Sequence, residues 1–296
     1  MKSETKLKLG LGAVLTLFVF AAAYVIYGMA KDLGARGVSH FMADPAAAYE
    51  SDEAIGEALA RYHSGAAPAR LLAAPPSDAV ILVFDGLPPK TDTQRLLSVL
   101  RAKHVKAFFF VEGENAAMEA DLIRKIKRDG HTVGNFTFYG QGAAGKLPIE
   151  KFMKEAVWTQ TALTDILGSA PQYMRAPGTP VSQELLLRVG AAGIPTYVDT
   201  PHLFLPGQMK TEAAVKTFAA SVGGGTILAV VSGHPVVGGP RKPKIQTGKN
   251  GPIEHKPTVK DSAYTSPSEE VTMSEKVEIL LQELSAKGLR IVGEEL

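Results

Sequence analysis

The sequence predicts an α/β protein whose parallel sheet is either open or closed into a barrel, preceded by one membrane-spanning helix. From residue 79 onward, short apolar runs alternate with segments in which apolar residues have helical spacing. This alternation requires right-handed crossovers between parallel strands. An uncharged apolar stretch near the N-terminus predicts the membrane helix.

The membrane helix is expected over residues 9–30, which contain no charged side chain. At about 1.5 Å per residue, a helix of this length extends roughly 33 Å and crosses the hydrocarbon core of a bilayer. Basic side chains outnumber the acidic one in residues 1–8, so the positive-inside rule predicts a cytoplasmic stub and a periplasmic or extracytoplasmic bulk of the chain. We therefore expect a single-pass protein of the inner (cytoplasmic) membrane. The alternative is a cleaved signal peptide with a weak small-residue site at 28–30.

Two segments lie outside the predicted core. Residues 31–78 contain recurrent glycine and proline and predict a tether, with a short helix over 52–62. Residues 235–271 also lack apolar periodicity, and within 241–260 six basic side chains face only Glu254. A loop of this length is either functional or disordered.

The predicted core, residues 79–296, follows the alternation of strand and helix. The run AVILVF over 79–84 is fully apolar and predicts a buried parallel strand. Further strands are expected over 106–111, 131–135, 172–177, 195–200, 226–231 and 289–292. Helices are expected over 91–103, 116–128, 148–167, 182–192, 211–221 and 274–287, with Ser182 near a cap.

Polar side chains follow five of the strands, at Asp85, Asn135, Arg175, Asp199 and His234. The carboxyl ends of parallel strands share one face, where ligands bind in such folds, so we expect these side chains to form one site. The alternative is that they reflect only the usual polarity of strand ends.

Composition excludes several classes of function. The net charge of +2 provides no long-range field that would favour nucleic acid. The chain contains no cysteine, which excludes disulfides, cysteine-based zinc sites and a thiol nucleophile.

Five short motifs carry a resemblance to a known family: VFDGLP (83–88), GHTVGNFTFYG (130–140), MRAPG (174–178), ILAVVSGHP (227–235) and the closing LLQELSAKGLRIVGEEL. In order and spacing they resemble the NodB-homology domain of polysaccharide deacetylases, carbohydrate esterase family four. The resemblance covers 79–296 without the 235–271 insertion. It implies a distorted (β/α)7 barrel that removes acetyl groups from chitin-like polymers, peptidoglycan or exopolysaccharide.

The chain departs from this family at the metal ligands. Aligned without gaps, Asp85 takes the place of the family's catalytic base, whereas its three metal-binding residues are replaced by Gly86, Phe136 and Gly140. If Asp85 is instead the metal-binding Asp, the base is missing. A catalytic zinc needs about three N, O or S ligands, so we expect no metal or other cofactor. Without a metal to polarise the acetyl carbonyl, a carboxylate of reference pKa about 3.9 is a poor base at neutral pH.

The resemblance also implies roles for other residues. His234 takes the place of the catalytic histidine, and Arg175 that of an arginine that orients the base, so we expect an Asp85–Arg175 ion pair. His131 is expected to be a buried structural residue, and His202 to lie on a loop surface.

Four residues are expected to contact substrate: Arg175, Asn135, Asp199 and Tyr139. The aromatic run over 136–139 suits stacking on sugar rings and plain packing equally well.

Three functions remain open at this point. The leading interpretation is an envelope-anchored, catalytically inactive homologue that binds an envelope polysaccharide or peptidoglycan, or supports its processing. The second is an active deacetylase or amidohydrolase, acting on non-peptide carbon–nitrogen bonds of a polysaccharide through a non-standard site. The third is a scaffold subunit of a membrane complex, whose partner the basic 235–271 insertion contacts.

Overall fold

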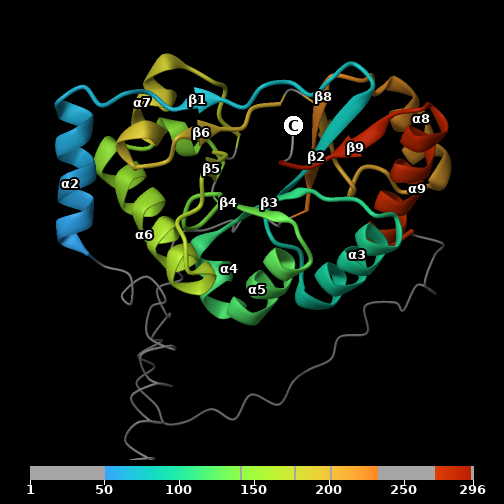
Figure 1. The fold of residues 1–296 in the computed structure, drawn as a ribbon, viewed down its shortest axis with the longest axis horizontal. Helices are drawn as coiled ribbons and strands as arrows, with labels where there is room; N and C mark the ends of the chain where they lie inside the picture. Colours follow the sequence, from blue (N-terminus) through green and yellow to red (C-terminus); the bar gives the residue numbers. More distant parts are fainter. Residues whose placement is uncertain (1–50, 141, 177, 201, 233–270, 295–296) are drawn as a thin grey trace, which may run out of the picture. The chain divides into compact units, whose positions relative to one another are not determined.

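The computed structural model describes residues 51–140, 142–176, 178–200, 202–232 and 271–294. These residues form one curled sheet of nine strands surrounded by helices (Figure 1). The strands are β1 (Arg70–Leu71), β2 (Ala79–Asp85), β3 (Phe108–Val111), β4 (Thr132–Asn135), β5 (Tyr173–Met174), β6 (Thr196–Tyr197), β7 (His202–Phe204), β8 (Thr226–Val231) and β9 (Arg290–Val292).

The sheet order is β1-β6-β5-β4-β3-β2-β8-β7, with β9 paired to β2, and the pairings are parallel. Strands β1 and β7 lie at the two ends of this order, and no pairing among the described residues joins them. The predicted parallel α/β fold is therefore confirmed as a curled half-barrel. Neither β1 nor β7 was predicted, because each has only two or three residues and no apolar run.

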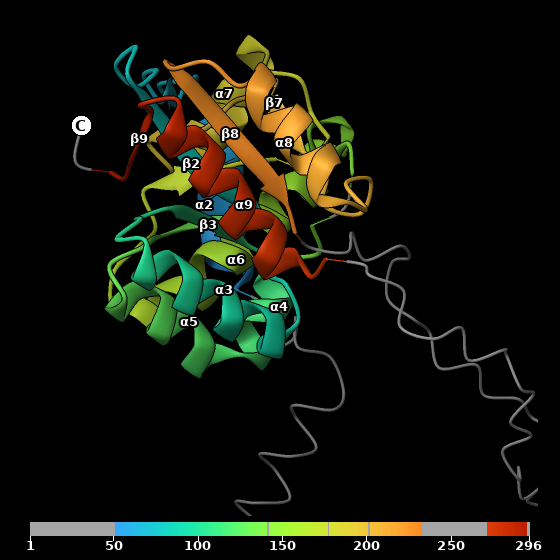
Figure 2. The same ribbon diagram turned by 90° about the vertical axis from the view of Figure 1, so that its right-hand side faces the viewer.

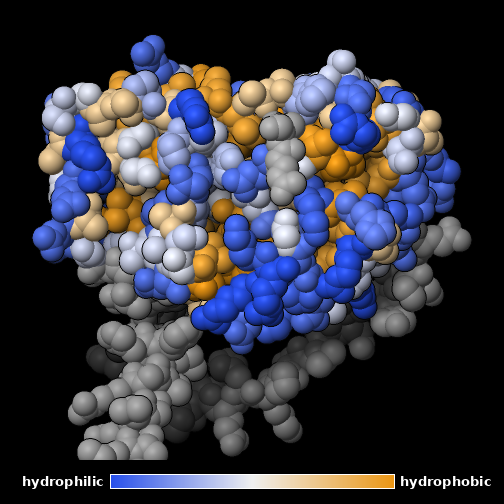
Figure 3. Space-filling view, viewed as in Figure 1, coloured by the Kyte–Doolittle hydropathy of each residue, from blue (hydrophilic) through white to orange (hydrophobic). Residues whose placement is uncertain are grey.

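The helices are α2 (Asp52–His63), α3 (Lys90–Ala102), α4 (Gly113–Met118), α5 (Ala120–Arg128), α6 (Ile149–Leu167), α7 (Gln183–Ala191), α8 (Glu212–Ser221) and α9 (Met273–Ala286), with a 3-10 turn over Ala144–Lys146. Helices α8 and α9 lie side by side next to β8 (Figure 2). The outward side of α5 is strongly hydrophilic (Figure 3), since its apolar residues face the core.

The central strand β2 is covered on both faces: helices pack on one face, and the apolar interior of the half-barrel packs on the other. All seven of its residues are buried. Successive side chains point to opposite faces, so Leu82 and Phe84 join the cluster under the helices, while Ile81 and Val83 join the interior cluster with Phe110. A fully apolar run is the pattern expected for a strand covered on both faces.

Local capping fixes several helix ends. Ser182 caps α7 by accepting from the Leu185 amide, as predicted. The helix expected over 116–128 is two helices instead, because Glu119, with φ −122° and ψ 41°, leaves the helical region. The first of them begins early, at Gly113, where a Cβ would lie 2.5 Å from Phe138 Cδ2.

Residues 51–78 differ from the prediction of a tether. Helix α2, at one edge of Figure 1, packs against α6 and α7. Its Arg61 Nε donates to the Ala191 carbonyl at 2.9 Å, and Tyr62 Oη donates to Glu184 Oε1 at 2.5 Å. Strand β1 then extends the sheet by pairing with β6. Residues 51–78 of the expected tether are therefore part of the fold, because α2 packs its apolar face against α6 and α7. The frequent glycine and proline of residues 31–78 had favoured a tether instead.

Within the described ranges, no helix has the length and apolar character needed to cross a bilayer. The membrane helix predicted over 9–30 lies outside these ranges, as do His234 and residues 235–270 of the basic insertion.

Candidate functional site

A cavity of about 650 Å³ opens at the carboxyl ends of the strands. Its lining includes residues that end β2, β3, β4, β5 and β6 or follow them within two positions: Asp85, Glu112, Phe136, Arg175 and Asp199. The sequence rule that strand ends meet at one face thus brings three of the five predicted polar residues together. Asn135 and Tyr139 do not line the cavity, and His234 is outside the described residues.

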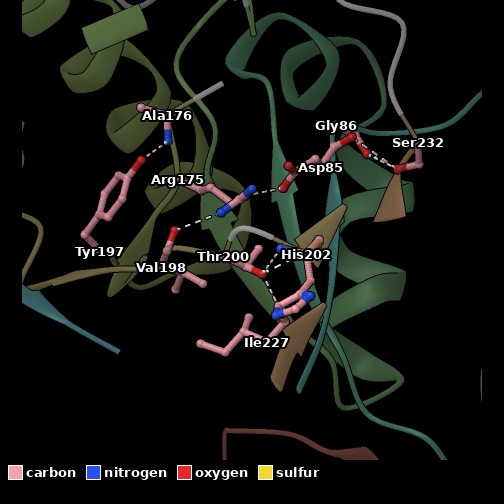
Figure 4. Close-up of polar contacts among 10 residues, drawn as sticks. All are labelled: Asp85, Gly86, Arg175, Ala176, Tyr197, Val198, Thr200, His202, Ile227 and Ser232. Atoms are coloured by element: carbon pink, nitrogen blue, oxygen red, sulfur yellow. Dashed lines mark hydrogen bonds and ion pairs between the residues drawn. The ribbon is translucent and has the colours of Figure 1, made fainter. Parts of the chain in front are cut away.

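The expected ion pair is formed by two residues that line this cavity, and Figure 4 shows the two side chains pointing toward one another. Arg175 Nε donates to Asp85 Oδ1 at 2.7 Å, and the two side chains are 9% and 8% exposed. Arg175 also donates from Nη1 to the Val198 carbonyl at 3.2 Å. Burial raises the pKa of the Asp85 carboxyl, while the charge and hydrogen bond of Arg175 act in the opposite direction. The guanidinium is therefore held in place by two acceptors and fixes the carboxylate in return.

Next to the ion pair, the turn after β2 begins at Gly86, which has no side chain and forms contacts only through its backbone. Gly86 has a φ of +82°, which glycine adopts without strain, and its carbonyl accepts from Ser232 Oγ at 2.7 Å (Figure 4). The Ser232 amide donates to the Asp85 carbonyl at 3.0 Å. These bonds tie the end of β8 to the turn.

The segment after β4, residues 136–140, is held in place by packing and by hydrogen bonds of Asn135. Phe138 is fully buried, and its ring meets Trp158 edge-on with 5.4 Å between centroids. Asn135 is fully buried as well: its Nδ2 donates to the Ala156 carbonyl at 2.9 Å, and its Oδ1 accepts from the Thr137 amide at 2.9 Å. Both ends of the Asn135 amide therefore hold the segment in shape. Of the aromatic run, Phe136 is the residue that lines the cavity.

Glu112 is a site residue that the sequence reasoning missed. It follows β3 directly, is 2% exposed, and lines the cavity. Its Oε2 accepts from the Leu87 amide and from Asn115 Nδ2, both at 2.9 Å. Burial raises the pKa of the Glu112 carboxyl, and the charge of Asp85 adds to this. The signal was available, because Glu112 obeys the same strand-end rule as the other five residues.

The two described histidines of interest lie away from the cavity. His131 is 2% exposed, and its Nδ1 accepts from the Ala107 amide at 3.2 Å, so the proton of the neutral ring is on Nε2. Burial, with a contribution from Lys106, lowers the pKa of His131 to about 4. The buried structural role expected for His131 is confirmed. His202 is exposed, as expected, but it begins strand β7 and does not lie on a loop; its amide donates to Thr200 Oγ1 at 3.0 Å (Figure 4).

The donors that the described residues bring to this site do not by themselves fit a catalytic zinc. Among the described residues there is no group of three or more His, Asp or Glu side chains that could hold a metal ion. Three positions matter here, those at which the family resemblance implies metal ligands. Gly86 and Gly140 have no donor side chain, and Phe136 has only a hydrocarbon ring. Residue 140 is also closely confined, because a Cβ there would lie 2.6 Å from Glu112 Cγ.

A curled parallel half-barrel with a strand-end cavity defines the class of protein, and comparison with known proteins identifies the family. The sequence model of the polysaccharide deacetylase family matches residues 73–197. A chitooligosaccharide deacetylase of Sinorhizobium fredii is 30% identical over 162 residues, which cover 53% of this chain and 73% of the relative. The chain belongs to the polysaccharide deacetylase family.

Other relatives match over a smaller share. A peptidoglycan-N-acetylglucosamine deacetylase of Bacillus cereus is 33% identical over 98 residues, which cover 33% of this chain and 35% of the relative. A chitin deacetylase of Colletotrichum lindemuthianum is 37% identical over 103 residues, 33% of this chain and 41% of the relative. The chain thus spans well under half the length of these two relatives.

Solved structures share the fold. A family 4 carbohydrate esterase from Streptomyces lividans superposes with a TM-score of 0.53 at 20% identity, covering 72% of this chain and 91% of that chain. A family 4 pseudoenzyme from Bacillus anthracis superposes with a TM-score of 0.55 at 13% identity, covering 77% of this chain and 68% of that chain.

Proposed function

We propose that this chain is a membrane-anchored polysaccharide-deacetylase-like protein of the cell envelope that binds a glycan without deacetylating it. The observation that carries the proposal is the donor set of the cavity: residues 86, 136 and 140, where the family resemblance implies metal ligands, are Gly, Phe and Gly. Deacetylation needs a polarised acetyl carbonyl and an activated water, for which a metal ion supplies several kcal/mol of transition-state stabilisation.

The remaining groups of the cavity suit binding better than catalysis. The Asp85 carboxylate is oriented by Arg175 at 2.7 Å, as the family resemblance implies for a base, but without a metal ion to activate the water a carboxylate is a weak base at neutral pH. The apolar wall formed by Phe136, Val181 and Leu203 offers a surface for the face of a sugar ring. Named relatives are deacetylases of peptidoglycan and chitooligosaccharide, which supports a polymer of amino sugars as the ligand.

The test of this proposal measures metal, acetate and binding on the same preparation of the full chain in detergent. We expect under about 0.2 zinc per chain and no change of melting temperature with EDTA, because a bound metal would stabilise the fold by mass action. We also expect no acetate release from N-acetylglucosamine oligomers or peptidoglycan, but measurable binding of an amino-sugar oligomer. Stoichiometric metal together with acetate release would overturn the proposal.

Anchoring in the inner membrane is a separate part of the proposal, supported by the uncharged run over 9–30 and the basic residues before it. Fusion of a reporter that is active only outside the cytoplasm after Leu296 tests it. We expect this fusion to be active and a matched cytoplasmic reporter at the same position to be silent. The reverse pattern would contradict the proposed location.

One observation favours a second candidate, an active hydrolase with a non-standard site. Two buried carboxylates, Asp85 and Glu112, line the same cavity, and paired acids with separated pKa values are a common catalytic arrangement. Acetate release that persists in EDTA and is abolished by Glu112→Gln would favour this candidate over a binding protein.

A further inference from the structure

We propose that the cavity selects a de-N-acetylated amino sugar, binding its ammonium group beside Glu112, in preference to the N-acetylated form. This ligand class deepens the glycan-binding function proposed above and rests on it. Three features of the cavity carry the inference: its charge balance, the fixed position of the Glu112 carboxylate, and the apolar walls around it.

The charge balance of the cavity favours a cation. Of the residues that the structure describes, Asp85, Glu112 and Asp199 line it together with one guanidinium, that of Arg175. Arg175 Nε is committed to Asp85, and its Nη1 to the Val198 carbonyl. The Asp85 carboxylate is thus paired. Among the described lining residues, no cation pairs with the carboxylates of Glu112 and Asp199.

Glu112 is the carboxylate for which this matters most. It is 2% exposed, and both of its hydrogen-bond donors, the Leu87 amide and Asn115 Nδ2, are neutral. No described residue forms an ion pair with it. A buried carboxylate without a counter-ion is costly, and an ammonium group of a ligand supplies the missing charge, whereas an acetamido group does not.

The Glu112 carboxylate is also fixed for binding. The two neutral donors both reach Oε2, which leaves Oε1 on the side of Gly140, where it lies 3.3 Å from the position of a Cβ at residue 140. Gly140 lines the cavity and has a φ of +60°. The absence of a side chain there gives a ligand access to this edge of the carboxylate.

The walls of the cavity fit a sugar rather than a small cation. Phe136, Pro180, Val181 and Leu203 line it, and Leu203 is 41% exposed although it is a large apolar residue. A volume of about 650 Å³ lies within the usual range of roughly 300–1,000 Å³ for organic-ligand pockets. The combination of apolar walls and a positioned acid matches an amino sugar, whose ring is amphipathic and whose amine is charged.

The experiment compares two tetramers, one of glucosamine and one of N-acetylglucosamine, by calorimetry with the full chain in detergent at pH 6. We expect the glucosamine tetramer to bind at least about 10-fold more tightly, since one well-placed ion pair discriminates to that degree. Glu112→Gln should weaken the glucosamine tetramer about 10-fold and change the other tetramer by less than about 2-fold. The matched control is Glu53→Gln, the same chemical change on the exposed side of α2, which should change neither affinity.

A measurement on the unaltered protein keeps the test independent of how Glu112→Gln folds. Raising the pH from 6 to 9 deprotonates the amines of the glucosamine tetramer, since such groups have pKa values near 8 or below, and the preference should fall toward unity. If neither tetramer binds at pH 6, glycan binding itself is wrong. If the N-acetylated tetramer binds equally or more tightly, or the preference survives at pH 9, glycan binding stands and the ammonium site is wrong.

Discussion

Two sides of the same cavity are built by different forces. On one side, the ends of β2 and β5 are joined by a buried charge pair, Asp85–Arg175, with 2.7 Å between Oδ1 and Nε. On the other side, the segment after β4 is held by neutral contacts: the Asn135 amide binds backbone, and Phe138 packs on Trp158. The polar half of the site is therefore fixed by electrostatics, and the other half by packing against α6.

This contrast bears on how the site changes function. A charge pair cannot lose one member without leaving a buried charge, so both residues tend to stay. A segment held by apolar packing and neutral hydrogen bonds tolerates changes of side chain more readily, provided the interior stays filled. Four predictions test this contrast, in decreasing order of expected effect.

The largest effect is expected from breaking the charge pair. Asp85→Ala should lower the free energy of unfolding by about 3–5 kcal/mol, because Arg175 is then left buried and unpaired. The double variant with Arg175→Ala should cost less than the sum of the two single variants. Chemical denaturation of all four proteins measures this. Asp78→Ala, which removes an exposed partner of Arg290, is the control and should change stability little. Additive losses at Asp85 and Arg175 would show that no electrostatic coupling holds this side.

Gly140→Ala tests the packed side. Residue 140 has a positive φ and its Cβ would meet Glu112 Cγ at 2.6 Å, so we expect a loss of about 2–3 kcal/mol from backbone strain and the shift of a buried side chain. Gly193→Ala is the matched control: its φ is also positive, but a Cβ there has no neighbour within 4 Å, so strain alone should cost about 1 kcal/mol. Equal losses at the two glycines would mean that Glu112 does not confine residue 140.

The acid sensitivity of His131 tests whether the packing before the start of β4, at the opposite end of the strand from the cavity, also depends on a neutral group. The pKa of His131 is lowered to about 4 in the fold, against about 6.5 in the unfolded chain. The unfolded state therefore binds more protons between these values, and the free energy of unfolding should fall by roughly 2 kcal/mol as the pH drops from 6.5 to 4, solvent screening included. Comparison of denaturation curves with those of His131→Gln isolates this contribution. An unchanged slope in the variant would mean that another group titrates.

The smallest effect is a gain in stability at Glu155, on the buried side of α6. This carboxyl is 2% exposed, and burial raises its pKa, with Lys151 acting in the opposite direction. A carboxyl whose pKa is raised in the fold stabilises at low pH and loses that contribution as the pH rises. Glu155→Gln should therefore raise the free energy of unfolding by about 1 kcal/mol at pH 7 and by little at pH 4. A loss of stability at pH 7 would show that the ionised carboxylate is needed beneath the segment after β4.

The order of the strands and helices could be predicted from the amino-acid pattern alone. The apolar run of β2 and its neighbours β3 and β8 needed no tertiary information, because a strand buried on both faces leaves a continuous apolar pattern. The same logic located Asp85 and Arg175 at one face, since parallel strands end together. Their pairing was expected from the family resemblance and not from the strand pattern. Strand-end polarity was a sufficient signal for Glu112 too, but it was not applied there.

Only the tertiary structure decided what each polar group binds. Asn135 has the same sequence signature as Asp85, yet its amide is consumed by Ala156 and Thr137, because α6 happens to pass over the end of β4. Helix α2 carries no long apolar run, and its place in the fold depends on packing against α6 and α7. A local sequence pattern indicates burial and periodicity. The hydrogen-bond partner of a side chain and the helices against which another helix packs depend on segments distant in the chain, which come together only when the chain folds.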